Sequence, residues 1–474
     1  MKEYKTLLAG KWVLLNDVIE VKNKLTGEVI GTVPKAKEKD VELAVNTSER
    51  AFNDFRKWPS YKRAEILEKT ANFINVEKEK FAEMLALEVG KAWKFAIGEV
   101  ERAIETFTFA AEEAKKIHGE TVPMDASPTG VNRIGYYYRV PVGVVATIAP
   151  FNFPLNLVAH KVAPAIASGN TIVLKPASTT PIVSLMLAEK LLQAGLPAEV
   201  LNIVIGSGDT VGNWLVSNPK CRKISFTGSQ SVGEEIMKKA GIKKVTMELG
   251  NNSATIIDES ANIEKAIPRC IVSAFACSGQ VCISLQRLYV HKNMADKFIN
   301  LFIEGVKKLK VGNPLEKDTD IGPMIDKSEA IRAEEWINEA VKGGAKILIG
   351  GKREGSILYP TVLTNVQDSM KVVCKEIFAP VVVIEIFDDF KKAVDKVNNT
   401  PYGLQAGVFT NDINNAYYAI DNIDVGGVMI NDTSMYRVDH MPYGGNKLSG
   451  IGREGVKYAI EEMTNIKMVV FNMN

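Results

Sequence analysis

Cysteine and histidine are scarce in this 474-residue sequence, which contains five cysteines and four histidines. The cysteines are odd in number and scattered over a long chain, so they favour a reducing compartment over a disulfide framework. We expect that compartment to be the cytoplasm. No group of cysteines and histidines has the spacing of zinc ligands, and the sequence therefore predicts no metal site.

Long apolar runs and an excess of one charge are also missing. The least charged stretch, residues 140–159, is interrupted by Pro141, Pro150 and Pro154, which excludes a membrane span. The opening residues, MKEYK, do not have the apolar core of a signal peptide. The net charge is +2 with acids and bases interspersed, so we expect neither nucleic acid nor a membrane as a partner.

Hydrophobic residues make up 46% of the chain and charged residues 24%, which is typical of a globular protein, and the length favours two domains. From residue 142 onward, apolar strands alternate with helices. This pattern predicts a parallel sheet covered on both faces, a Rossmann-like α/β arrangement whose ligands bind at the carboxyl ends of the strands. The predicted strands are 144–148, 171–174, 200–205, 223–226 and 244–248, and the helices are 155–168, 181–194, 209–217 and 231–240.

The alternation restarts after residue 250 and predicts a second α/β domain. Its strands are expected at 254–257, 288–290, 346–349, 381–386 and 405–409, and its helices at 261–276, 294–309, 327–342, 389–398 and 412–421. Ahead of the first sheet, residues 1–35 predict a β-rich lead-in, and residues 39–116 predict helices with a break at Trp58-Pro59.

Two further segments belong to neither alternating pattern. Residues 119–140 predict exposed, tyrosine-rich strands that leave the main body, and such strand edges can pair with another subunit. An ordinary surface hairpin fits the same residues, and both interpretations stay open. Residues 465–471 form a lone apolar strand that can pair with 119–140, in the same subunit or in another.

Two glycine-rich segments follow strands of the first domain. The segment that contains Gly208 and Gly212 is one residue longer than the usual dinucleotide fingerprint and is weak evidence alone. The segment that contains Gly228 and Ser229 joins a strand directly to a helix, so its free backbone N–H groups can bind a pyrophosphate. An ordinary capped turn explains this second segment as well.

Polar residues follow three strands of the same sheet. Lys175 and Glu248 each close a strand, and Asn152 lies between two prolines after a third. Each of these alone is commonly a solvated loop residue, but together they form a candidate site in which the Asn152 amide can donate to an oxyanion. Cys282 follows a Ser-Gly turn after the first helix of the second domain. It is either a reachable thiolate nucleophile or an inert core cysteine.

A series of short motifs accompanies these residues along the chain. They are Pro150-Phe-Asn-Phe-Pro154, Leu174-Lys-Pro176, Phe226-Thr-Gly-Ser229, Met247-Glu-Leu-Gly250, Gly279-Gln-x-Cys282, Lys310-Val-Gly-Asn-Pro314, Glu376-Ile-Phe378-x-Pro380, Asn399-Thr-x-Tyr-Gly403 and Pro442-Tyr-Gly-Gly445. In type and order they resemble the motifs of the aldehyde dehydrogenase superfamily over the whole chain.

The resemblance implies an aldehyde dehydrogenase-like fold. It divides the chain into a coenzyme-binding domain (1–118 and 141–249), a catalytic domain (250–432) and a β oligomerisation arm (119–140 and 453–474). Such an arm builds dimers or tetramers, so the resemblance favours an intermolecular role for the tyrosine-rich strands and predicts a homo-oligomer.

The resemblance also implies NAD(P)-dependent oxidation of an aldehyde to its acid, with Cys282 as nucleophile and Asn152 with the Cys282 N–H as oxyanion donors. Glu248 then activates the water that hydrolyses the thioester. The implied cofactor residues are Ile148, Pro150, Phe151, Lys175, Ser178, Gly208, Gly212, Thr227, Gly228, Ser229, Leu249, Glu376 and Phe378.

Two alternatives to this activity remain. Relatives that transfer the acyl group to coenzyme A generally lack the glutamate that Glu248 matches. A catalytically silent binding protein would have no need to keep Cys282, Asn152, Glu248 and Lys175 together.

Ser178 bears on the choice of cofactor. Many NAD-preferring relatives have a glutamate at this position, which grips the adenosine ribose and repels a 2′-phosphate. Ser178, Thr179 and Thr180 remove that repulsion, and Lys175 adds positive charge. We therefore expect NADP⁺ to be accepted and preferred, with NAD⁺ also used.

The segments 111–123 and 437–445 most resemble relatives that act on small hydroxylated or anionic aldehydes, such as lactaldehyde, glyceraldehyde 3-phosphate and sulfo-substituted aldehydes. His160 and Arg437 are the candidate groups for such a substrate. The alternative for His160 is a hydrogen-bonded core histidine, and for Arg437 a surface charge.

Two residues depart from the family pattern. Asn251 and Ala379 stand where glycines are common. We expect both changes to affect the fine geometry of the site and not the class of reaction.

Overall fold

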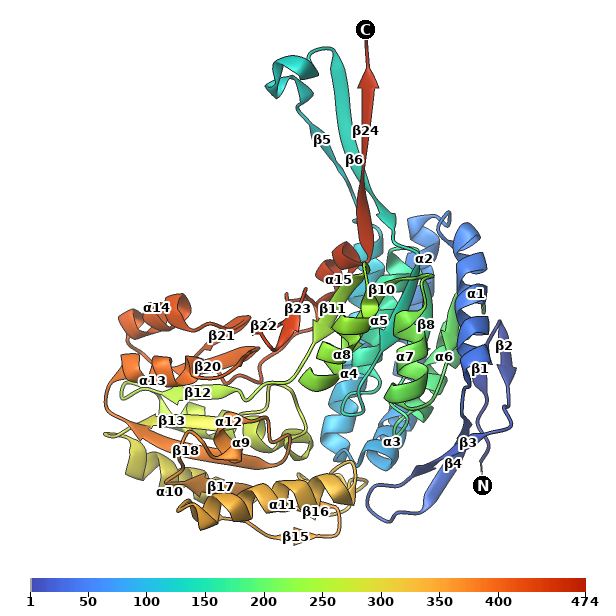
Figure 1. Cartoon of the computed structure of the whole chain (residues 1–474). Coiled ribbons are helices and arrows are strands. Elements are labelled where there is room, and N and C mark those ends of the chain that lie inside the picture. Colours follow the sequence, from blue (N-terminus) through green and yellow to red (C-terminus); the bar gives the residue numbers. More distant parts are fainter. Residues whose placement is uncertain (1) are drawn as a thin grey trace.

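The computed structural model describes residues 2–474 and shows two α/β bodies, with a β arm projecting from one of them (Figure 1). A six-stranded and a seven-stranded sheet organise the two bodies, and a three-stranded sheet forms the arm. The predicted α/β class with two sheet-based bodies and a β arm is therefore confirmed. The first residue of the predicted range 1–118 lies outside the described chain.

The six-stranded sheet has the order β23-β11-β10-β7-β8-β9. Strands β7 to β11 run parallel, and the short β23 pairs antiparallel with β11. The chain enters this sheet at β7, continues outward through β8 to β9, and then returns to the other side of β7 to form β10 and β11. Such a reversal of strand order creates a ligand site at the carboxyl ends of the central strands. The strands are β7 (Val144–Ile148), β8 (Thr171–Lys175), β9 (Leu201–Ile203), β10 (Cys221–Thr227), β11 (Lys244–Glu248) and β23 (Gly450–Ile451).

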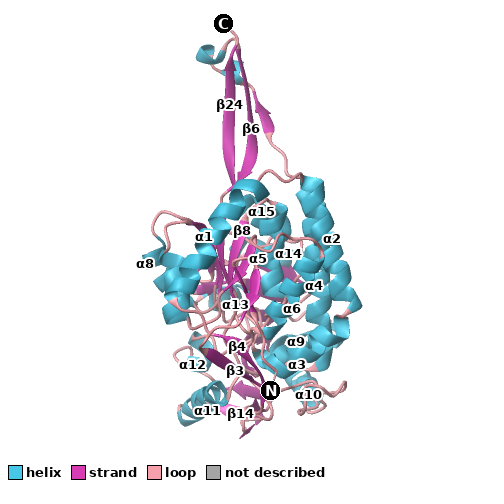
Figure 2. Cartoon of the chain, turned by 90° about the vertical axis from the view of Figure 1, so that its right-hand side faces the viewer, coloured by secondary structure: helices cyan, strands magenta, loops and turns pink. Residues whose placement is uncertain are grey.

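Helices lie on both sides of these strands, as the alternation predicted (Figure 2). They are α1 (Glu38–Phe55), α2 (Ser60–Val76), α3 (Lys78–Val89), α4 (Trp93–Ala114), α5 (Asn156–Ala167), α6 (Ile182–Gln193), α7 (Asn213–Ser217) and α8 (Gln230–Ala240). The predicted helix 209–217 is a π-helical turn over Gly208–Gly212 followed by α7. Within residues 2–474, no helix combines the length and apolar character needed to cross a bilayer.

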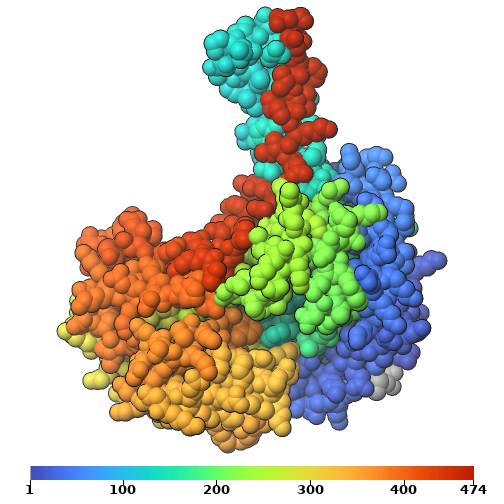
Figure 3. Space-filling model, in the orientation of Figure 1, coloured from blue at the N-terminus to red at the C-terminus, as the bar shows by residue number. Residues whose placement is uncertain are grey.

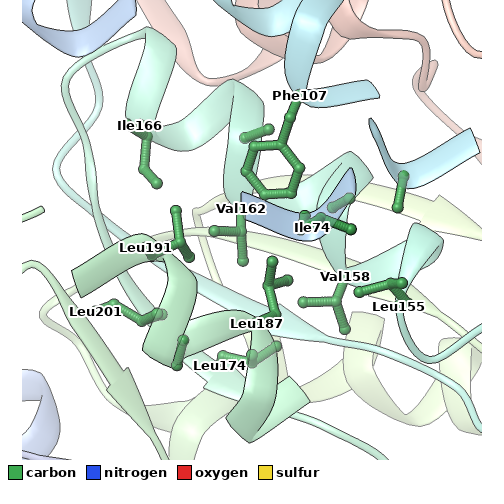
Figure 4. Close-up of a cluster of buried hydrophobic side chains, with 14 of the residues drawn as sticks. Ile74, Phe107, Leu155, Val158, Val162, Ile166, Leu174, Leu187, Leu191 and Leu201 are labelled. Atoms are coloured by element: carbon green, nitrogen blue, oxygen red, sulfur yellow. The ribbon is translucent and has the colours of Figure 1, made fainter. Parts of the chain in front are cut away.

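Apolar side chains from these helices and strands close a continuous core (Figure 4). Phe107 of α4, Val158 of α5, Leu187 of α6 and Leu174 of β8 are all buried within it. Burying such a side chain contributes about 1.5–3 kcal/mol, so the cluster holds α5 firmly against β8. The start of α5 and the end of β8, where candidate site residues lie, are positioned by this packing.

The seven-stranded sheet has the order β14-β17-β18-β13-β12-β20-β21, parallel except for β14. Its strands are β12 (Ala254–Ile257), β13 (Arg287–His291), β14 (Lys346–Ile349), β17 (Thr361–Thr364), β18 (Val381–Phe387), β20 (Gln405–Phe409) and β21 (Gly427–Ile430). Its helices are α9 (Ile263–Phe275), α10 (Ala295–Val306), α11 (Lys327–Lys342), α12 (Lys371–Cys374), α13 (Phe390–Asn398) and α14 (Ile413–Asn422). The sequence pattern missed β17 and β21.

The remaining strands are short. The expected β-rich lead-in consists of two hairpins, β1 (Thr6–Leu8) with β2 (Lys11–Val13) and β3 (Val18–Lys22) with β4 (Val29–Pro34). Two small ribbons pair β15 (Arg353–Glu354) with β16 (Ile357–Leu358) and β19 (Tyr402–Gly403) with β22 (Asn446–Lys447).

The arm stands away from the rest of the molecule (Figure 3). β24 (Thr464–Asn472) pairs antiparallel with the whole of β6 (Arg133–Pro141), and β5 (Glu120–Val122) lies on the other side of β6. The last strand therefore pairs with the tyrosine-rich segment of its own chain. Helix α15 (Val456–Glu462), which was assigned to the arm, packs against α4 and α5, so the arm sheet begins at Thr464 and not at residue 453. The division into coenzyme-binding, catalytic and oligomerisation parts stays a prediction.

Candidate active site

Four predicted residues lie at the carboxyl edge of the six-stranded sheet. Ile148 at the end of β7 is paired with Lys175 at the end of β8, and Thr227 at the end of β10 is paired with Glu248 at the end of β11. Since parallel strands end on the same side of a sheet, their order in the sheet brings together residues that are far apart in the sequence.

A cavity of about 280 Å³ lies at this edge and is lined by Ile148, Lys175, Gly208 and Gly212, together with Phe226, Val232 and Ile236. The Lys175 ammonium is buried, and its one hydrogen bond within residues 2–474 goes to the Pro176 carbonyl at 3.3 Å. Burial lowers the pKa of Lys175 to about 8. A buried cation without a carboxylate partner is suited to an anionic ligand, so this cavity fits the adenosine end of the nicotinamide cofactor that the resemblance implies.

Ser178 lies on the loop after β8. Its hydroxyl donates to the Gly206 carbonyl at 2.6 Å, which holds the side chain against the glycine-rich segment that follows β9. Glu88 accepts hydrogen bonds from the backbone N–H groups of Ile182 and Val183, at 2.9 and 3.0 Å, and so fixes the end of the same loop to α3. The position of Ser178 is therefore set from both sides.

The Thr-Gly-Ser turn after β10 leads directly into α8, as expected. The Gly228 N–H donates to the Glu248 carbonyl at 3.0 Å, and a Cβ at Gly228 would lie 2.5 Å from the Phe226 ring. Ser229 is the residue before the first turn of α8. Thr227 is turned inward and accepts a hydrogen bond from Lys161 Nζ at 2.7 Å, so its hydroxyl is occupied within the protein.

Leu249, directly after β11, contacts α8. Its side chain packs against Gly233 of α8, where a Cβ would lie 2.6 Å from a Leu249 methyl group. Leu249 thus serves to pack α8 onto the end of β11, next to Glu248.

Glu376, Phe378 and Phe151 form the second part of the implied cofactor site. Glu376 Oε1 accepts a hydrogen bond from the Asn251 N–H at 2.9 Å, and burial raises the pKa of Glu376 to about 7. The Phe378 and Phe151 rings meet edge to face, with centroids 5.9 Å apart. Pro150 directly precedes Phe151 in the loop that follows β7.

The two departures from the family pattern contribute backbone groups to this region, and the Asn251 side-chain amide also donates to Ser253 Oγ at 2.5 Å. Asn251 contributes its N–H to Glu376, which any residue except proline can do. The Ala379 carbonyl lies against Gly279, where an added Cβ would be only 2.1 Å from the oxygen and where φ is +70°. Glycine is therefore required at position 279, and the alanine at 379 is accommodated without loss of this contact.

Cys282 follows α9 and a tight turn. The turn contains Cys277, Ser278 and Gly279, all with positive φ, and Cys282 Sγ lies 3.0 Å from Tyr443 Oη. Burial raises the pKa of Cys282 to about 11, against the lowering effect of the Tyr443 hydrogen bond.

Cys277 lies just beyond the helix. α9 ends at Phe275, and Cys277 adopts a left-handed conformation in the turn that follows. Its side chain is still buried in an apolar cluster with Val281, Ile283 and Leu404. Cys277 therefore contributes to packing beside the turn.

Asn152 is brought close to this turn. Its Nδ2 donates to the Gln280 carbonyl at 2.8 Å, two residues before the candidate nucleophile. This bond uses one N–H of the amide and leaves the other free to donate to an oxygen bound at Cys282.

The Glu248 carboxyl group is buried, and neither of its oxygens has a hydrogen-bond partner among the described residues. Burial raises its pKa well above the ordinary value, and the charge of Glu454 raises it further. A Cβ at Gly444 would lie 2.9 Å from Glu248 Oε1, so glycine there leaves room for the carboxyl group. A carboxyl group with a raised pKa and free oxygens is suited to take a proton from water.

Arg437 is not a surface charge. Its side chain is 5% exposed, its guanidinium lies 3.6 Å from the Tyr443 ring centroid, and its Nη2 donates to Glu454 Oε2 at 3.2 Å. Although burial acts in the opposite direction, the negative groups around it raise the pKa of Arg437. Its Nε has no partner within residues 2–474.

His160 is a buried, hydrogen-bonded histidine. Its Nε2 donates to Asp439 Oδ1 at 2.7 Å, and Arg437 Nη2 lies 3.3 Å from the same nitrogen. Burial and the charge of Arg437 lower the pKa of His160, which favours the neutral ring. Asp439 also accepts two hydrogen bonds from Arg102, and it ties α4 to the loop that carries Arg437.

Several residues of this network were not identified from the sequence. They are Lys161, Tyr443, Glu454, Asp439 and Arg102. Tyr443 lies within a recognised motif, but nothing in the motif indicates that its hydroxyl faces Cys282. The others make contacts across large separations in the chain, which no local pattern indicates. Across residues 2–474, no group of three or more His, Cys, Asp or Glu side chains is arranged to hold a metal ion.

Comparison with known proteins gives consistent matches. The profile described as "Aldehyde dehydrogenase family" matches residues 12–469. The chain is 50% identical to a 3-sulfolactaldehyde dehydrogenase of Priestia aryabhattai over 100% of this chain and 99% of that protein. It is 45% identical to a lactaldehyde dehydrogenase of Methanococcus aeolicus over 98% and 99% of the two chains. It also resembles the crystal structure of a glyceraldehyde-3-phosphate dehydrogenase of Methanocaldococcus jannaschii complexed with NADP, with TM-score 0.93, 43% identity and coverage of 97% and 100%.

Proposed function

This chain belongs to the aldehyde dehydrogenase family, and we propose that it oxidises a small aldehyde with an anionic or hydroxylated tail to the carboxylic acid. The observation that carries the proposal is the convergence of three groups from different elements. Cys282 follows α9 and contacts the Tyr443 hydroxyl, Asn152 is bonded to the turn before it, and the Glu248 carboxyl group at the end of β11 lies against Gly444, the residue after Tyr443.

In the first step, the Cys282 thiolate attacks the aldehyde carbon and a C–S bond forms. The negative charge moves to the former carbonyl oxygen. The free N–H of the Asn152 amide and the Cys282 backbone N–H donate to this oxygen. Loss of one such donor typically costs on the order of 100-fold or more in rate.

Bound NAD(P)⁺ would accept the hydride from the adduct carbon, which leaves a thioester on Cys282. The residues that would hold the cofactor are Lys175 at the adenosine end and Glu376 and Phe378 at the nicotinamide end. The edge-to-face contact of Phe378 with Phe151 fixes the ring that would flank the nicotinamide.

Glu248 completes the reaction. Its carboxylate takes a proton from water, the hydroxide adds to the thioester carbon, and the C–S bond breaks to release the acid and the Cys282 thiolate. Since neither Glu248 oxygen has a partner within the described residues, both can receive this proton. Water is the acyl acceptor in this proposal, and coenzyme A is not required.

The cofactor preference that we propose is NADP⁺ over NAD⁺. Ser178 is uncharged and lies on the loop after Lys175, whose buried ammonium can pair with a 2′-phosphate. The similarity to a protein crystallised with NADP supports this choice.

For the substrate, we propose that Arg437 binds the tail of the aldehyde. It is close enough to Cys282 for the two charges to interact, and its Nε–H is unpaired within residues 2–474. The names of the similar proteins, which refer to sulfolactaldehyde and glyceraldehyde 3-phosphate, are consistent with an anionic tail. His160, which was proposed beside it, contacts Asp439 and Arg437, so its effect on the substrate would be indirect.

The arm supports a proposal of homo-oligomerisation. Its strands expose Ile134, Tyr136, Tyr138, Ile466, Met468 and Val470. Apolar side chains on a projecting sheet are suited to pairing with a second copy. A cytoplasmic location is proposed because all five cysteines are free thiols.

One experiment tests the proposed activity. The protein is mixed with a panel of charged, hydroxylated and plain aliphatic aldehydes and with NADP⁺ or NAD⁺, and the absorbance of the reduced cofactor is followed with and without coenzyme A. We expect the highest kcat/KM for anionic or hydroxylated aldehydes without coenzyme A. A strict requirement for coenzyme A would indicate the acylating reaction, and no signal with any aldehyde would indicate a binding protein.

A further inference from the structure

We propose that the Tyr443 hydroxyl stabilises the Cys282 thiolate by donating a hydrogen bond to its sulfur, an inference that rests on the proposed thiol chemistry. The two atoms lie 3.0 Å apart. Tyr443 is 2% exposed, and the sulfur is the one hydrogen-bond partner of its hydroxyl within residues 2–474. A hydrogen bond to an ionised acceptor is about twice as strong as one between neutral groups, so this contact favours the thiolate over the thiol.

Backbone hydrogen bonds fix the position of Tyr443 and so direct its hydroxyl toward Cys282. Its N–H donates to the Glu454 carbonyl at 3.0 Å, and the Glu454 N–H donates back to the Tyr443 carbonyl at 2.6 Å. Its ring is packed among Val281, Ile283 and Leu404. The donor is therefore held in place before the substrate arrives, which is what stabilisation of a charge in a buried site requires.

Arg437 strengthens the donor. Its guanidinium lies over the Tyr443 ring, 3.6 Å from the centroid, and is held there by Glu454. A cation on the face of a phenol draws electron density from the ring, which makes the hydroxyl proton more positive. Glu454 thus positions both the tyrosine and the cation that acts on it.

The expected effect on the nucleophile has two parts. Loss of the donor lowers the fraction of thiolate at neutral pH. It also makes the remaining thiolate more reactive, since thiolate nucleophilicity rises with pKa with a slope of about 0.4–0.5. A change that only disturbed packing would not lower the fraction of thiolate and at the same time raise the reactivity of the remaining thiolate.

The test is the pH dependence of Cys282 alkylation by iodoacetamide in the wild-type protein and in Tyr443→Phe, with modification of the Cys282 peptide measured by mass spectrometry. Because the pKa of Cys282 is already about 11 in the wild-type protein, the two profiles are compared below their midpoints, from about pH 7 to 10. We expect alkylation of the variant to be about threefold slower for each unit by which its profile shifts upward, since the loss of thiolate exceeds the gain in nucleophilicity. Coinciding profiles would overturn the proposal.

Cys374 gives an internal control, because it is partly exposed and lies outside the site, and its profile should be the same in both proteins. Tyr289→Phe removes another buried hydroxyl, on β13, and should leave the Cys282 profile unchanged. If Tyr443→Phe does not fold, Arg437→Lys serves as a second variant that keeps the tyrosine, with a smaller shift expected in the same direction. No shift in Arg437→Lys would then overturn the proposal.

The readout does not depend on turnover. If the wild-type protein oxidises no aldehyde, the proposed function fails while the alkylation profiles still answer the question about Tyr443. If oxidation proceeds and the profiles coincide, only the role of Tyr443 is refuted.

Discussion

Glu248 and Glu454 are neighbouring buried carboxyl groups whose pKa values are displaced in opposite directions. Burial opposes ionisation of both. For Glu454 this is outweighed by Lys161, 2.7 Å from Oε1, and Arg437, 3.2 Å from Oε2, which lower its pKa to about 2. Glu248 has no such partner among the described residues, and the charge of Glu454 adds to the effect of burial. Glu454 is therefore charged at neutral pH, whereas Glu248 has the raised pKa that its proposed role as a general base requires.

The first prediction follows from the raised pKa of Glu248. Since the proposed base is the Glu248 carboxylate, thioester hydrolysis should slow as the pH falls through that raised pKa. Glu248→Gln should lower the steady-state rate by about 10²–10⁴-fold and leave a burst of reduced cofactor in the first turnover. Stopped-flow absorbance measures both phases. Glu264→Gln, an exposed glutamate on α9, is the control, and an unchanged steady-state rate in Glu248→Gln would exclude this role.

The second prediction compares Cys277, which lies in the turn after α9, with Cys282, which follows the turn. Cys282→Ala should abolish oxidation because the acyl group then has no attachment point. Cys277→Ala should keep oxidation, since burial raises the pKa of its thiol and the side chain only packs. Initial rates with a saturating aldehyde measure the difference. A comparable loss in both variants would show that the nucleophile is misassigned or that Cys277 has a second role.

The third prediction concerns cofactor choice at Ser178. Ser178→Glu should lower kcat/KM for NADP⁺ by at least about tenfold, which corresponds to roughly 1.4 kcal/mol, because a carboxylate would repel the 2′-phosphate. The value for NAD⁺ should change little. Ser178→Ala is the matched control, which removes the hydroxyl without adding charge. A wild-type preference for NAD⁺ of more than about tenfold would refute the interpretation of Ser178.

The fourth prediction tests whether Arg437 binds the charge of the substrate. Arg437→Ala should raise KM for glyceraldehyde 3-phosphate far more than for propanal, since only the former has an anionic tail. Arg269→Ala, which removes an exposed arginine paired with Asp432, is the control and should change neither value. Equal changes in KM for the two aldehydes would mean that Arg437 supports the structure of the site without binding charge.

The sequence predicted those site residues that follow from the topology of the sheet. Lys175 and Glu248 end parallel strands, so the alternation of strands and helices was enough to place them on one edge. Cys282 and Asn152 were predicted from motifs, and the hydrogen bond from Asn152 to Gln280 brings the two segments together.

The interior of the site could not be predicted in the same way. The sequence left Arg437 as either a substrate-binding group or a surface charge, because the residues that bury it, Tyr443 and Glu454, contact it through the fold and not through local sequence. The left-handed conformation of Cys277 was not predicted, because nothing in the local sequence indicates it. The backbone leaves the helix there because Gly279 must approach the Ala379 carbonyl, and that constraint comes from a segment a hundred positions further along the chain.

The pairing of β24 with β6 has a consequence for the biosynthesis of the protein. Residues 133–141 leave the ribosome long before residues 464–472, which are their partners along the whole strand. At the usual rate of translation, this interval lasts roughly 20–60 s. Throughout it, the long edge of β6 is exposed to other nascent chains. Tyr443 and Glu454 are also translated long after β6, so neither the arm sheet nor the complete candidate site can form until those later residues have been made.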